Sequence, residues 1–481
     1  MSKFNRNEVK YNDNITYEGG NGYEKNPVQD WLNFLMSANL ENRFYESAGE
    51  QVERFVALTN RIGKEYGPEF VGKCAHFARN EIGMRSIVTL TAAILNEQIF
   101  PTKRSFFGSI LSRPDDVAEL FAAIDQLGGK RSNAVVRGAK DYLNTLNDYQ
   151  IGKYKMNSKD YNMYDLINIT HANSGAINRY KNGILETPDT WETKVSAADS
   201  QEERNQEWKH LVEEHKLGYL ALIRNLRNIM NADIDEAFIE YQLVPQLANA
   251  EKIQRSKVFP YQIYTAYKNM GVYNMEVSAA LDKAFRLACG NVDKLPGKSV
   301  ILLDVSGSMD SPYSKNSCMS IKEIGACYAA MMYISQDCDF VKFGNKAIVK
   351  AYNKLDNIFS IIDQMTRNDN CGWGTNERTA FAKLRQKYDR IFLVSDMQVM
   401  NDSGYCSIEG MTYKEYCEYY GDTDIYSFDL GNYASGCTDN KNNPRVHLMT
   451  SLDDSIFHLI ALCEDGVNIV DYINEYYDYT K

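Results

Sequence analysis

Three side chains that follow an apolar run have the chemistry to bind a metal ion together. Residues 299–303 (SVILL) are branched and uncharged, which is typical of a strand buried on both faces of a parallel sheet. Asp304, Ser306 and Ser308 come next, and Gly307 permits a tight turn between the two serines. One carboxylate and two hydroxyls are hard oxygen ligands, which suit Mg²⁺ or Mn²⁺. Taken alone, the pattern also fits a loop with a surface aspartate and a capping serine.

Two further segments place oxygen ligands where the first motif would need them. Thr375 lies in a glycine-rich loop (residues 372–376) just before a predicted helix. Asp396 ends a second apolar strand over residues 391–396. Ligands of open α/β sheets bind at the carboxyl ends of the strands, so these residues are expected at one edge. The sequence therefore predicts a metal site formed by Asp304, Ser306, Ser308, Thr375 and Asp396.

A short basic segment is the first candidate for binding a polyanion. Residues 128–140 contain Lys130, Arg131, Arg137 and Lys140, with no acidic residue among them. The Gly-Gly turn at its start leads into a helix, where backbone N–H groups favour phosphate. It is not an NTPase phosphate loop, because neither the leading glycine nor the Ser or Thr after the lysine is present. A solvated basic helix face explains the same residues equally well.

Two other places carry candidate polar groups. Arg79 and Arg85 lie at a helix junction with the sequence ARNEIGMRS, where they either contact a ligand or cap and pair helices. His171 is one of six histidines, and a lone histidine is more often a buried hydrogen-bonding residue than a catalytic one.

The elements that must position these residues fall into two parts. Residues 1–26 are polar and predict an N-terminal arm, and residues 27–296 read as medium-length helices without a heptad, which indicates an α-solenoid of helical pairs. After a boundary at residues 295–298 (LPGK), apolar strands alternate with helices through residues 297–481. This alternation predicts a doubly wound parallel sheet. The expected strands are 299–304, 339–343, 347–352, 390–396 and 424–430, and the expected helices are 321–335, 355–365, 379–387, one near 413–420 and a closing helix from residue 453.

Composition narrows the class of protein. A chain of 481 residues exceeds one ordinary core, so two large units are expected. No apolar stretch approaches a membrane span, the polar start has no signal-peptide core, and the ten cysteines form no C-x-x-C pair. These features predict a reduced, cytoplasmic protein.

Charge restricts where a polyanion would bind. Residues 1–296 hold 36 Lys and Arg against 38 Asp and Glu, whereas residues 297–481 hold 17 against 26. An acidic protein is not a general nucleic-acid binder, so RNA would have to meet a local basic patch in the first part. No nucleophile elbow, Cys–His pair or Walker lysine is present, and nothing supplies a general base beside Asp304. We therefore expect a binding protein and not an enzyme.

Residues 297–481 resemble a von Willebrand factor A domain. In that family the metal-ion-dependent adhesion site uses Asp-x-Ser-x-Ser, then Thr, then Asp. The resemblance implies that the five residues above are direct or water-mediated ligands of a divalent ion. It also implies an open coordination position for a partner's carboxylate or another anion.

The segments 78–86, 164–173, 219–228, 259–270 and 281–309 resemble TROVE-domain proteins, the Ro autoantigen family with bacterial and phage members. The resemblance implies a monomeric HEAT-like ring closed by the A domain. Such a ring binds small noncoding RNA of the Y class on its outer surface and takes ends of misfolded or structured RNAs into its hole. It acts in noncoding RNA quality control or processing.

Carried onto this chain, the RNA-binding residues are expected to be Lys130, Arg131, Arg137, Lys140, His171, Arg79 and Arg85. Relatives often carry Lys and Arg before the histidine, whereas this chain has Tyr164 and Asn168. An exoribonuclease or another protein is expected to contact the metal. The alternative is a metal-dependent protein-interaction module in which RNA binding is incidental.

Overall fold

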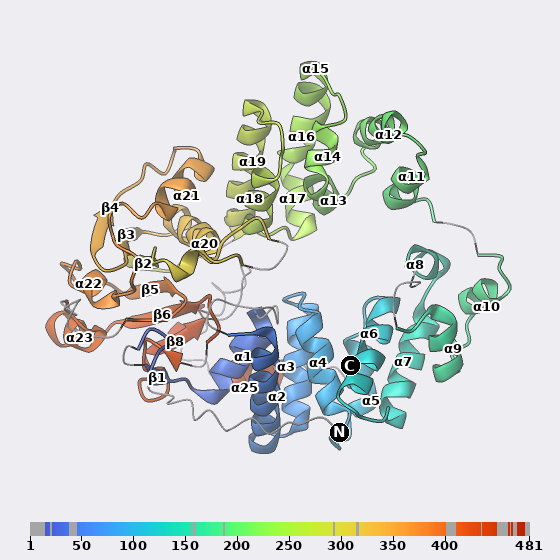
Figure 1. Ribbon diagram of the computed structural model, residues 1–481, viewed down its shortest axis with the longest axis horizontal. Coiled ribbons are helices and arrows are strands. Elements are labelled where there is room, and N and C mark those ends of the chain that lie inside the picture. The colour runs from blue at the N-terminus through green and yellow to red at the C-terminus, as the bar shows by residue number, and fades with distance from the viewer. Residues whose placement is uncertain are drawn as a thin grey trace. The chain divides into compact units, whose positions relative to one another are not determined.

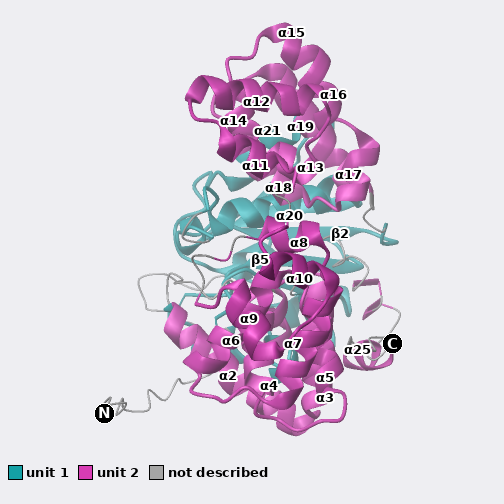
Figure 2. Cartoon of the chain, turned by 90° about the vertical axis from the view of Figure 1, so that its right-hand side faces the viewer, with its two compact units in different colours: residues 1–30, 42–47, 294–450 teal, residues 31–41, 48–293, 451–481 magenta. Residues whose placement is uncertain are grey.

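The computed structural model divides the chain into two compact units. It describes residues 15–19, 22–37, 46–154, 156, 160–185, 188–291, 294–313, 317–400, 410–433, 435–449, 460–461, 463–464 and 469–476. Unit 1 comprises residues 1–30, 42–47 and 294–450, and unit 2 comprises residues 31–41, 48–293 and 451–481 (Figure 2). Within the described ranges, no helix combines the length and the apolar character that crossing a bilayer requires.

Unit 2 is built from helices (Figure 1). They are α1 (Pro27–Ser37, from residue 31 on), α2 (Ala48–Glu65), α3 (Pro68–Asn80), α4 (Ser86–Leu95), α5 (Lys103–Ser109), α6 (Pro114–Gln126), α7 (Asn133–Thr145), α8 (Asp148–Lys153), α9 (Met163–Thr170), α10 (Gly175–Lys181), α11 (Trp191–Ala197), α12 (Gln201–Glu213), α13 (Tyr219–Arg224), α14 (Leu226–Met230), α15 (Glu236–Phe238), the π-helix η1 (Ile239–Leu243), α16 (Val244–Leu247), α17 (Ala250–Ser256), α18 (Pro260–Lys268), α19 (Met275–Ala288), the 3₁₀-helix η2 (Cys289–Asn291) and α25 (Ile469–Tyr476).

Helices of unit 2 pack mainly against helices close to them along the chain, as in a solenoid, and α25 is an exception that packs against α3. Helix α3 contacts α2 and α4, α5 contacts α7, and α18 contacts α19. Helix α2 shows the sequence basis of this packing, because Gln51, Phe55, Thr59 and Ile62 lie on one face and are buried. The helical-repeat prediction is confirmed. The π-helical turn η1 precedes Pro245, whose missing N–H cannot complete a regular α-helical ladder.

Unit 1 contains a six-stranded sheet in the order β4-β3-β2-β5-β6-β8. Its strands are β2 (Ser299–Asp304), β3 (Cys338–Phe343), β4 (Ala347–Lys350), β5 (Arg390–Ser395), β6 (Asp424–Asp429) and β8 (Val446–Met449). Neighbouring strands are parallel except for β4, which pairs antiparallel with β3 at one edge. The other elements are the 3₁₀-helix η3 (Ser308–Asp310), α20 (Ile321–Ser335), α21 (Ile358–Thr366), α22 (Glu377–Phe381) and α23 (Tyr413–Tyr420), with the short strands β1 (Tyr23–Glu24) and β7 (Ser435–Gly436).

Helices cover both faces of this sheet. Leu302 packs in a cluster with Phe381 of α22 and Tyr416 of α23. On the other face, α20 comes so close that a Cβ added to Gly325 would lie 3.3 Å from Leu303. Successive residues of β2 therefore face opposite helical layers, as parallel β-structure requires. The predicted doubly wound α/β domain is confirmed.

Several predicted boundaries shift in the structure. The helix expected over residues 379–387 is the short α22, which begins at Glu377 and ends at Phe381. The strand expected over residues 347–352 ends at Lys350 and runs antiparallel to its neighbour. The expected start of the closing helix at residue 453 lies outside the described residues.

A single boundary near residue 296 does not separate the two units. The N-terminal residues 1–30 belong to unit 1 with the sheet, and the C-terminal residues 451–481 belong to unit 2 with the helices. Strand β1, within the predicted N-terminal arm, pairs antiparallel with β7 of unit 1. Lys25 is buried there and donates to Asp429 Oδ2 at 2.5 Å and to the Tyr433 carbonyl oxygen. Helix α25, near the C-terminus, belongs to unit 2, where Lys73 of α3 donates to the Asn474 carbonyl oxygen at 2.7 Å.

Candidate metal centre and nucleic-acid interface

The carboxyl edge of the sheet brings the first and last predicted ligands together. Strands β2 and β5 are parallel neighbours, with Leu303 level with Val394, so Asp304 and Ser395 end their strands side by side. Ser395 donates its hydroxyl to Asp304 Oδ2 at 2.6 Å. Asp396 follows directly and is therefore at the same edge.

The Asp-x-Ser-x-Ser loop folds back on its own aspartate. The Ser306 N–H donates to Asp304 Oδ1 at 2.8 Å, and the Ser306 and Ser308 hydroxyl oxygens are 3.5 Å apart. Asp304, Ser306 and Ser308 are at most 4% exposed. The predicted convergence of one carboxylate and two hydroxyls is present in the structure.

The loop that carries Thr375 is hydrogen-bonded to the Asp-x-Ser-x-Ser loop. The Gly307 N–H donates to the Trp373 carbonyl oxygen at 2.8 Å. Asn368 donates from Nδ2 to the carbonyl oxygens of Val305 at 3.1 Å and Gly372 at 2.7 Å. These bonds fix the threonine loop beside the aspartate loop. Sequence reasoning missed Asn368 and Ser395, because each acts on a neighbouring loop and belongs to no motif of its own.

Two atoms of the site are buried without a hydrogen-bond partner among the described residues. They are Thr375 Oγ1 and Asp396 Oδ2. Both residues are at most 1% exposed, and a buried polar atom without a partner costs about 1–3 kcal/mol. Such atoms are expected where the missing partner is a ligand.

The electrostatics of the site also favour a cation. Burial raises the pKa of the Asp396 carboxyl above its ordinary value, and the nearby Asp304 charge raises it further. Burial likewise raises the pKa of Asp304, although hydrogen bonds from Ser395 and Ser306 oppose the rise. Two buried carboxylates repel each other unless a positive charge lies between them. The donor set consists of oxygens alone, so it fits Mg²⁺ or Mn²⁺. No group of three or more His, Cys, Asp or Glu side chains suited to a metal occurs in the parts of the chain that the structure describes.

The backbone after Asp396 is strained. Met397 has φ 63°, in the left-handed region that a side chain other than glycine rarely adopts. Its side chain is buried, and its N–H donates to Ser395 Oγ at 3.0 Å. Strain of this kind persists where the surrounding structure holds it, and it concentrates at ligand sites.

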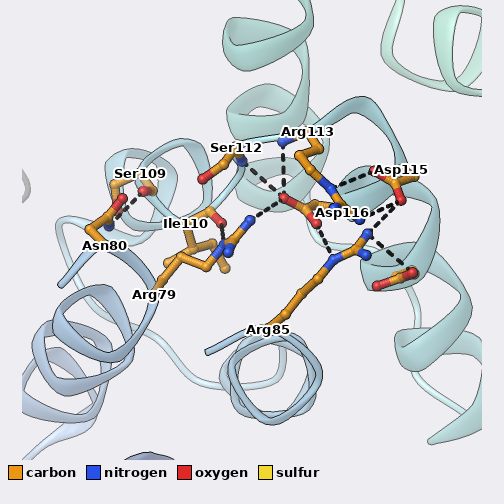
Figure 3. A network of polar contacts seen from close by, with 10 residues as sticks. Arg79, Asn80, Arg85, Ser109, Ile110, Ser112, Arg113, Asp115 and Asp116 are labelled. Atoms are coloured by element: carbon orange, nitrogen blue, oxygen red, sulfur yellow. Dashed lines mark hydrogen bonds and ion pairs between the residues drawn. The ribbon is translucent and has the colours of Figure 1, made fainter. Parts of the chain in front are cut away.

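The predicted RNA-binding arginines Arg79 and Arg85 are engaged in ion pairs inside unit 2. Figure 3 shows both guanidiniums pointing at the start of α6. Arg79 Nη2 donates to Asp116 Oδ2 at 2.7 Å, and Arg85 Nε donates to Asp116 Oδ1 at 2.7 Å. Arg85 also donates to Asp115 Oδ2 at 2.6 Å. The geometry gives these two arginines a helix-pairing role.

Asp116 is the centre of this network. It is 3% exposed and also accepts the backbone N–H groups of Ser112 and Arg113, each at 3.0 Å. Burial by itself raises the pKa of its carboxyl, but the Ser112 N–H and the two guanidiniums outweigh burial and hold that pKa below its usual value. The carboxylate is therefore ionised and fully bonded, at the N-terminus of a helix where negative charge is favoured.

Three basic side chains on and before α7 are available to a ligand. Lys130 and Arg137 are exposed and Lys140 is partly exposed. None of the three has an ion-pair partner among the described residues, whereas Arg104 on the neighbouring α5 holds Asp141 by two bonds of 2.7 and 2.8 Å. Arg137 and Lys140 are three positions apart and so share one side of the helix.

Arg131 differs from these three. Its Nη2 donates to both Asp125 carboxylate oxygens, at 2.6 and 2.8 Å, and to the Tyr161 hydroxyl. Its guanidinium also lies 5.0 Å from the Phe121 ring centroid. It serves to hold the Gly-Gly turn and α6 together.

His171 lies at the end of α9, which packs against α7. It is exposed and has φ 52°, the left-handed conformation that ends the helix. Two residues later, the Asn173 N–H donates to Asn144 Oδ1 of α7 at 2.8 Å. Tyr164, on the same helix, is 47% exposed and its ring lies 4.9 Å from that of Tyr180. The Asn173–Asn144 bond therefore places the end of α9, which carries His171, beside the C-terminal end of α7.

A close approach of two helix backbones fixes α7 in place. A Cβ added to Gly138 would lie 2.8 Å from the Arg104 carbonyl oxygen and 2.8 Å from Phe107 Cβ. Only a residue without a side chain fits between α5 and α7 at this point. The basic side chains of α7 are thus presented by a rigid support.

The architecture joins a helical-repeat unit to a doubly wound α/β unit whose sheet edge gathers oxygen donors. Residues 167–277 match the model of the TROVE domain family. The chain is also similar in fold to a crystal structure of the Ro (RSR) protein of Deinococcus radiodurans. That match has a TM-score of 0.61 at 14% identity, and it covers 90% of this chain and 99% of the Ro chain. The TROVE match thus agrees with the resemblance predicted for residues 164–173, 219–228 and 259–270, and the fold of the chain is similar to that of the Ro protein.

Proposed function

We propose that unit 2 binds structured noncoding RNA through the α7 surface, defined as Lys130, Arg137, Lys140 and His171. The observation that carries the proposal is that the three cations have no acidic partner among the described residues, whereas Arg104 and Arg131 beside them are paired. Phosphate contacts supply most of the affinity in sequence-independent binding, and they need free cations. The TROVE match supports RNA binding as the general class of function.

The proposed RNA is of the Y class or has the free end of a misfolded transcript. Tyr164 and Tyr149 are 47% and 49% exposed, and aromatic side chains bind unpaired bases by stacking. Base stacking contributes about 1–3 kcal/mol per base. A surface that combines free cations with exposed rings suits an RNA with both duplex and single-stranded parts, and it supports a role in RNA quality control or processing.

The salt dependence of binding tests this proposal. Each phosphate contact contributes roughly 0.7 to 0.9 to the slope of log K against log salt. The triple variant K130Q/R137Q/K140Q should therefore lower the slope by about 2 to 3. Filter binding of one structured RNA over a salt series measures it.

A matched control separates this surface from general charge. The variant R204Q/K209Q/K283Q removes three basic groups that lie elsewhere in unit 2 and have no ion-pair partner among the described residues. It should keep the wild-type slope. An equal fall in both variants would contradict a site on α7.

We further propose that unit 1 holds a divalent cation through Asp304, Ser306, Ser308, Thr375 and Asp396, and that this cation binds an acidic group of a partner. The unpartnered Thr375 Oγ1 and Asp396 Oδ2 support the site. The bound cation supplies a point of attachment for a carboxylate or phosphate oxygen. Trp373 is 68% exposed in the adjoining loop and would offer apolar contact area to a protein such as an exoribonuclease.

One variant tests this second role. Asp304→Ala should abolish Mg²⁺ binding in isothermal titration calorimetry and leave RNA affinity unchanged. Loss of RNA binding with retained folding would show that the two roles are not separate.

A further inference from the structure

An N-terminal segment, residues 15–19, lies against the loop that follows Asp396. The Thr16 hydroxyl donates to the Val399 carbonyl oxygen at 2.5 Å, and Thr16 is 3% exposed. The Tyr17 N–H donates to Gln398 Oε1 at 2.9 Å. Two consecutive residues of the segment are thus bonded to two consecutive residues of the loop, both within three positions of a predicted ligand.

Glu18 lies between two of these attachments. Gly19 forms an antiparallel bridge with Met400, whose N–H donates to the Thr375 carbonyl oxygen at 2.9 Å. Gln398, which accepts the Tyr17 N–H, donates its own backbone N–H to Asp396 Oδ1 at 3.3 Å. The backbone on either side of Glu18 is therefore one bonded step from a predicted ligand.

The Glu18 carboxylate reaches the metal site electrostatically. Its negative charge adds to the causes that raise the pKa of both Asp304 and Asp396. A third negative charge that acts on two buried carboxylates is unfavourable by itself and becomes favourable when a divalent cation lies among them. The electrostatic effect of Glu18 and the backbone contacts of its neighbours both place Glu18 beside the predicted ligands.

The segment is anchored on its other side as well. Lys25 is 4% exposed and forms ion pairs with Asp429 at 2.5 Å and Asp30 at 3.4 Å. The Tyr17 ring packs edge-on against Tyr433 at 5.5 Å between centroids. These contacts would hold the N-terminal segment beside the loop without a partner protein.

We propose that Glu18 is a ligand supplied by the chain itself, which occupies the coordination position that the five loop residues leave to an acidic partner. This inference rests on the proposed metal site. It makes residues 15–19 an internal occupant that a partner's acidic group must displace. Regulation of partner binding would then act on the N-terminal segment.

The test uses Mn²⁺ as the probe with the full chain. Glu18→Gln should weaken Mn²⁺ binding about tenfold or more, because affinity rises with the number of charged ligands. Water proton relaxation should show a larger enhancement per bound ion in the variant, since a water takes the vacated position. Adding acetate should lower that enhancement in Glu18→Gln and leave the wild type unchanged.

Glu24→Gln is the matched control. Glu24 belongs to β1 in the same N-terminal stretch and pairs with Lys441, away from the predicted ligands. It should behave as wild type in all three measurements. If the wild type binds Mn²⁺ and Glu18→Gln matches it, or if acetate acts equally on both, the inference about Glu18 is wrong.

Failure of the metal site itself looks different. A wild type that binds no Mn²⁺ contradicts both the proposed metal centre and the ligand role of Glu18. The acetate experiment on the wild type alone remains decisive if Glu18→Gln does not fold, because an open coordination position would respond to acetate.

Discussion

Asp116→Asn should destabilise unit 2 far more than a chemically similar change at its surface. The substitution keeps the shape of the side chain and removes the charge that Arg79 and Arg85 share. The side chain of Asp116 is 4% exposed, and those of the two arginines are 11% and 27% exposed. Removing one partner of a buried ion pair costs about 3–5 kcal/mol, because the other charge stays buried and unpaired.

The matched control is Asp141→Asn. Asp141 also holds one arginine by two bonds, but its side chain and that of Arg104 are 47% and 55% exposed. Exposed pairs contribute only about 0–1 kcal/mol. For a unit of this size, 1 kcal/mol shifts the unfolding midpoint by about 2–4 °C.

Circular dichroism during thermal unfolding measures the difference. Asp116→Asn should lower the midpoint of helix melting by about 6–20 °C, and Asp141→Asn by about 4 °C at most. Equal shifts would refute the assignment of the Arg79 and Arg85 network to stability. So would an Arg85→Ala variant that melts like wild type and loses RNA binding.

Three further outcomes are expected. The pKa of Asp116 is lower in the folded state than in the unfolded state, so its contribution to stability is present above the unfolded pKa near 3.8 and is lost as pH falls through the folded pKa. The difference in melting midpoint between wild type and Asp116→Asn should therefore shrink towards zero as the pH is lowered. A constant difference would contradict this assignment. Gly138→Ala should cost about 1–3 kcal/mol in denaturant unfolding, since its Cβ would meet the Arg104 carbonyl oxygen at 2.8 Å, whereas Gly290→Ala, which meets nothing within 4 Å, should cost far less. Thr375→Val should leave the stability of the metal-free protein unchanged or higher, because Thr375 Oγ1 has no hydrogen-bond partner among the described residues. The same variant should reduce the stabilisation by Mg²⁺, which for the wild type is about 2.7 kcal/mol at a Mg²⁺ concentration of 100 times Kd.

The sequence predicted that Asp304 and Asp396 lie at one sheet edge, because each stands at the end of a buried strand. An apolar run such as residues 299–303 specifies a central strand, and parallel strands bring Asp304 and Asp396 to one edge without further information. The helical character of residues 27–296 was likewise readable from apolar spacing and from the scarcity of alternation.

What the sequence did not reveal depends on single polar contacts between distant segments. Lys25 bonds Asp429 across 404 positions, and no local pattern marks either residue as a partner. The placement of residues 15–19 beside the metal loops follows from such contacts, so the N-terminal stretch read as an arm.

The basic residues were ambiguous for a related reason. Arg131 and Arg137 look alike in the sequence, and only the position of Asp125 separates a paired arginine from an available one.

The most direct test of the account is one structured RNA bound by three forms of the full chain. Filter binding at fixed salt should show strongly weakened binding by K130E/R137E/K140E and wild-type affinity for Asp304→Ala, with or without EDTA. This result is expected because the cations of α7 and the oxygen ligands of the sheet lie in different units. Loss of RNA affinity in Asp304→Ala or in EDTA, with the charge-reversal variant binding normally, would contradict it.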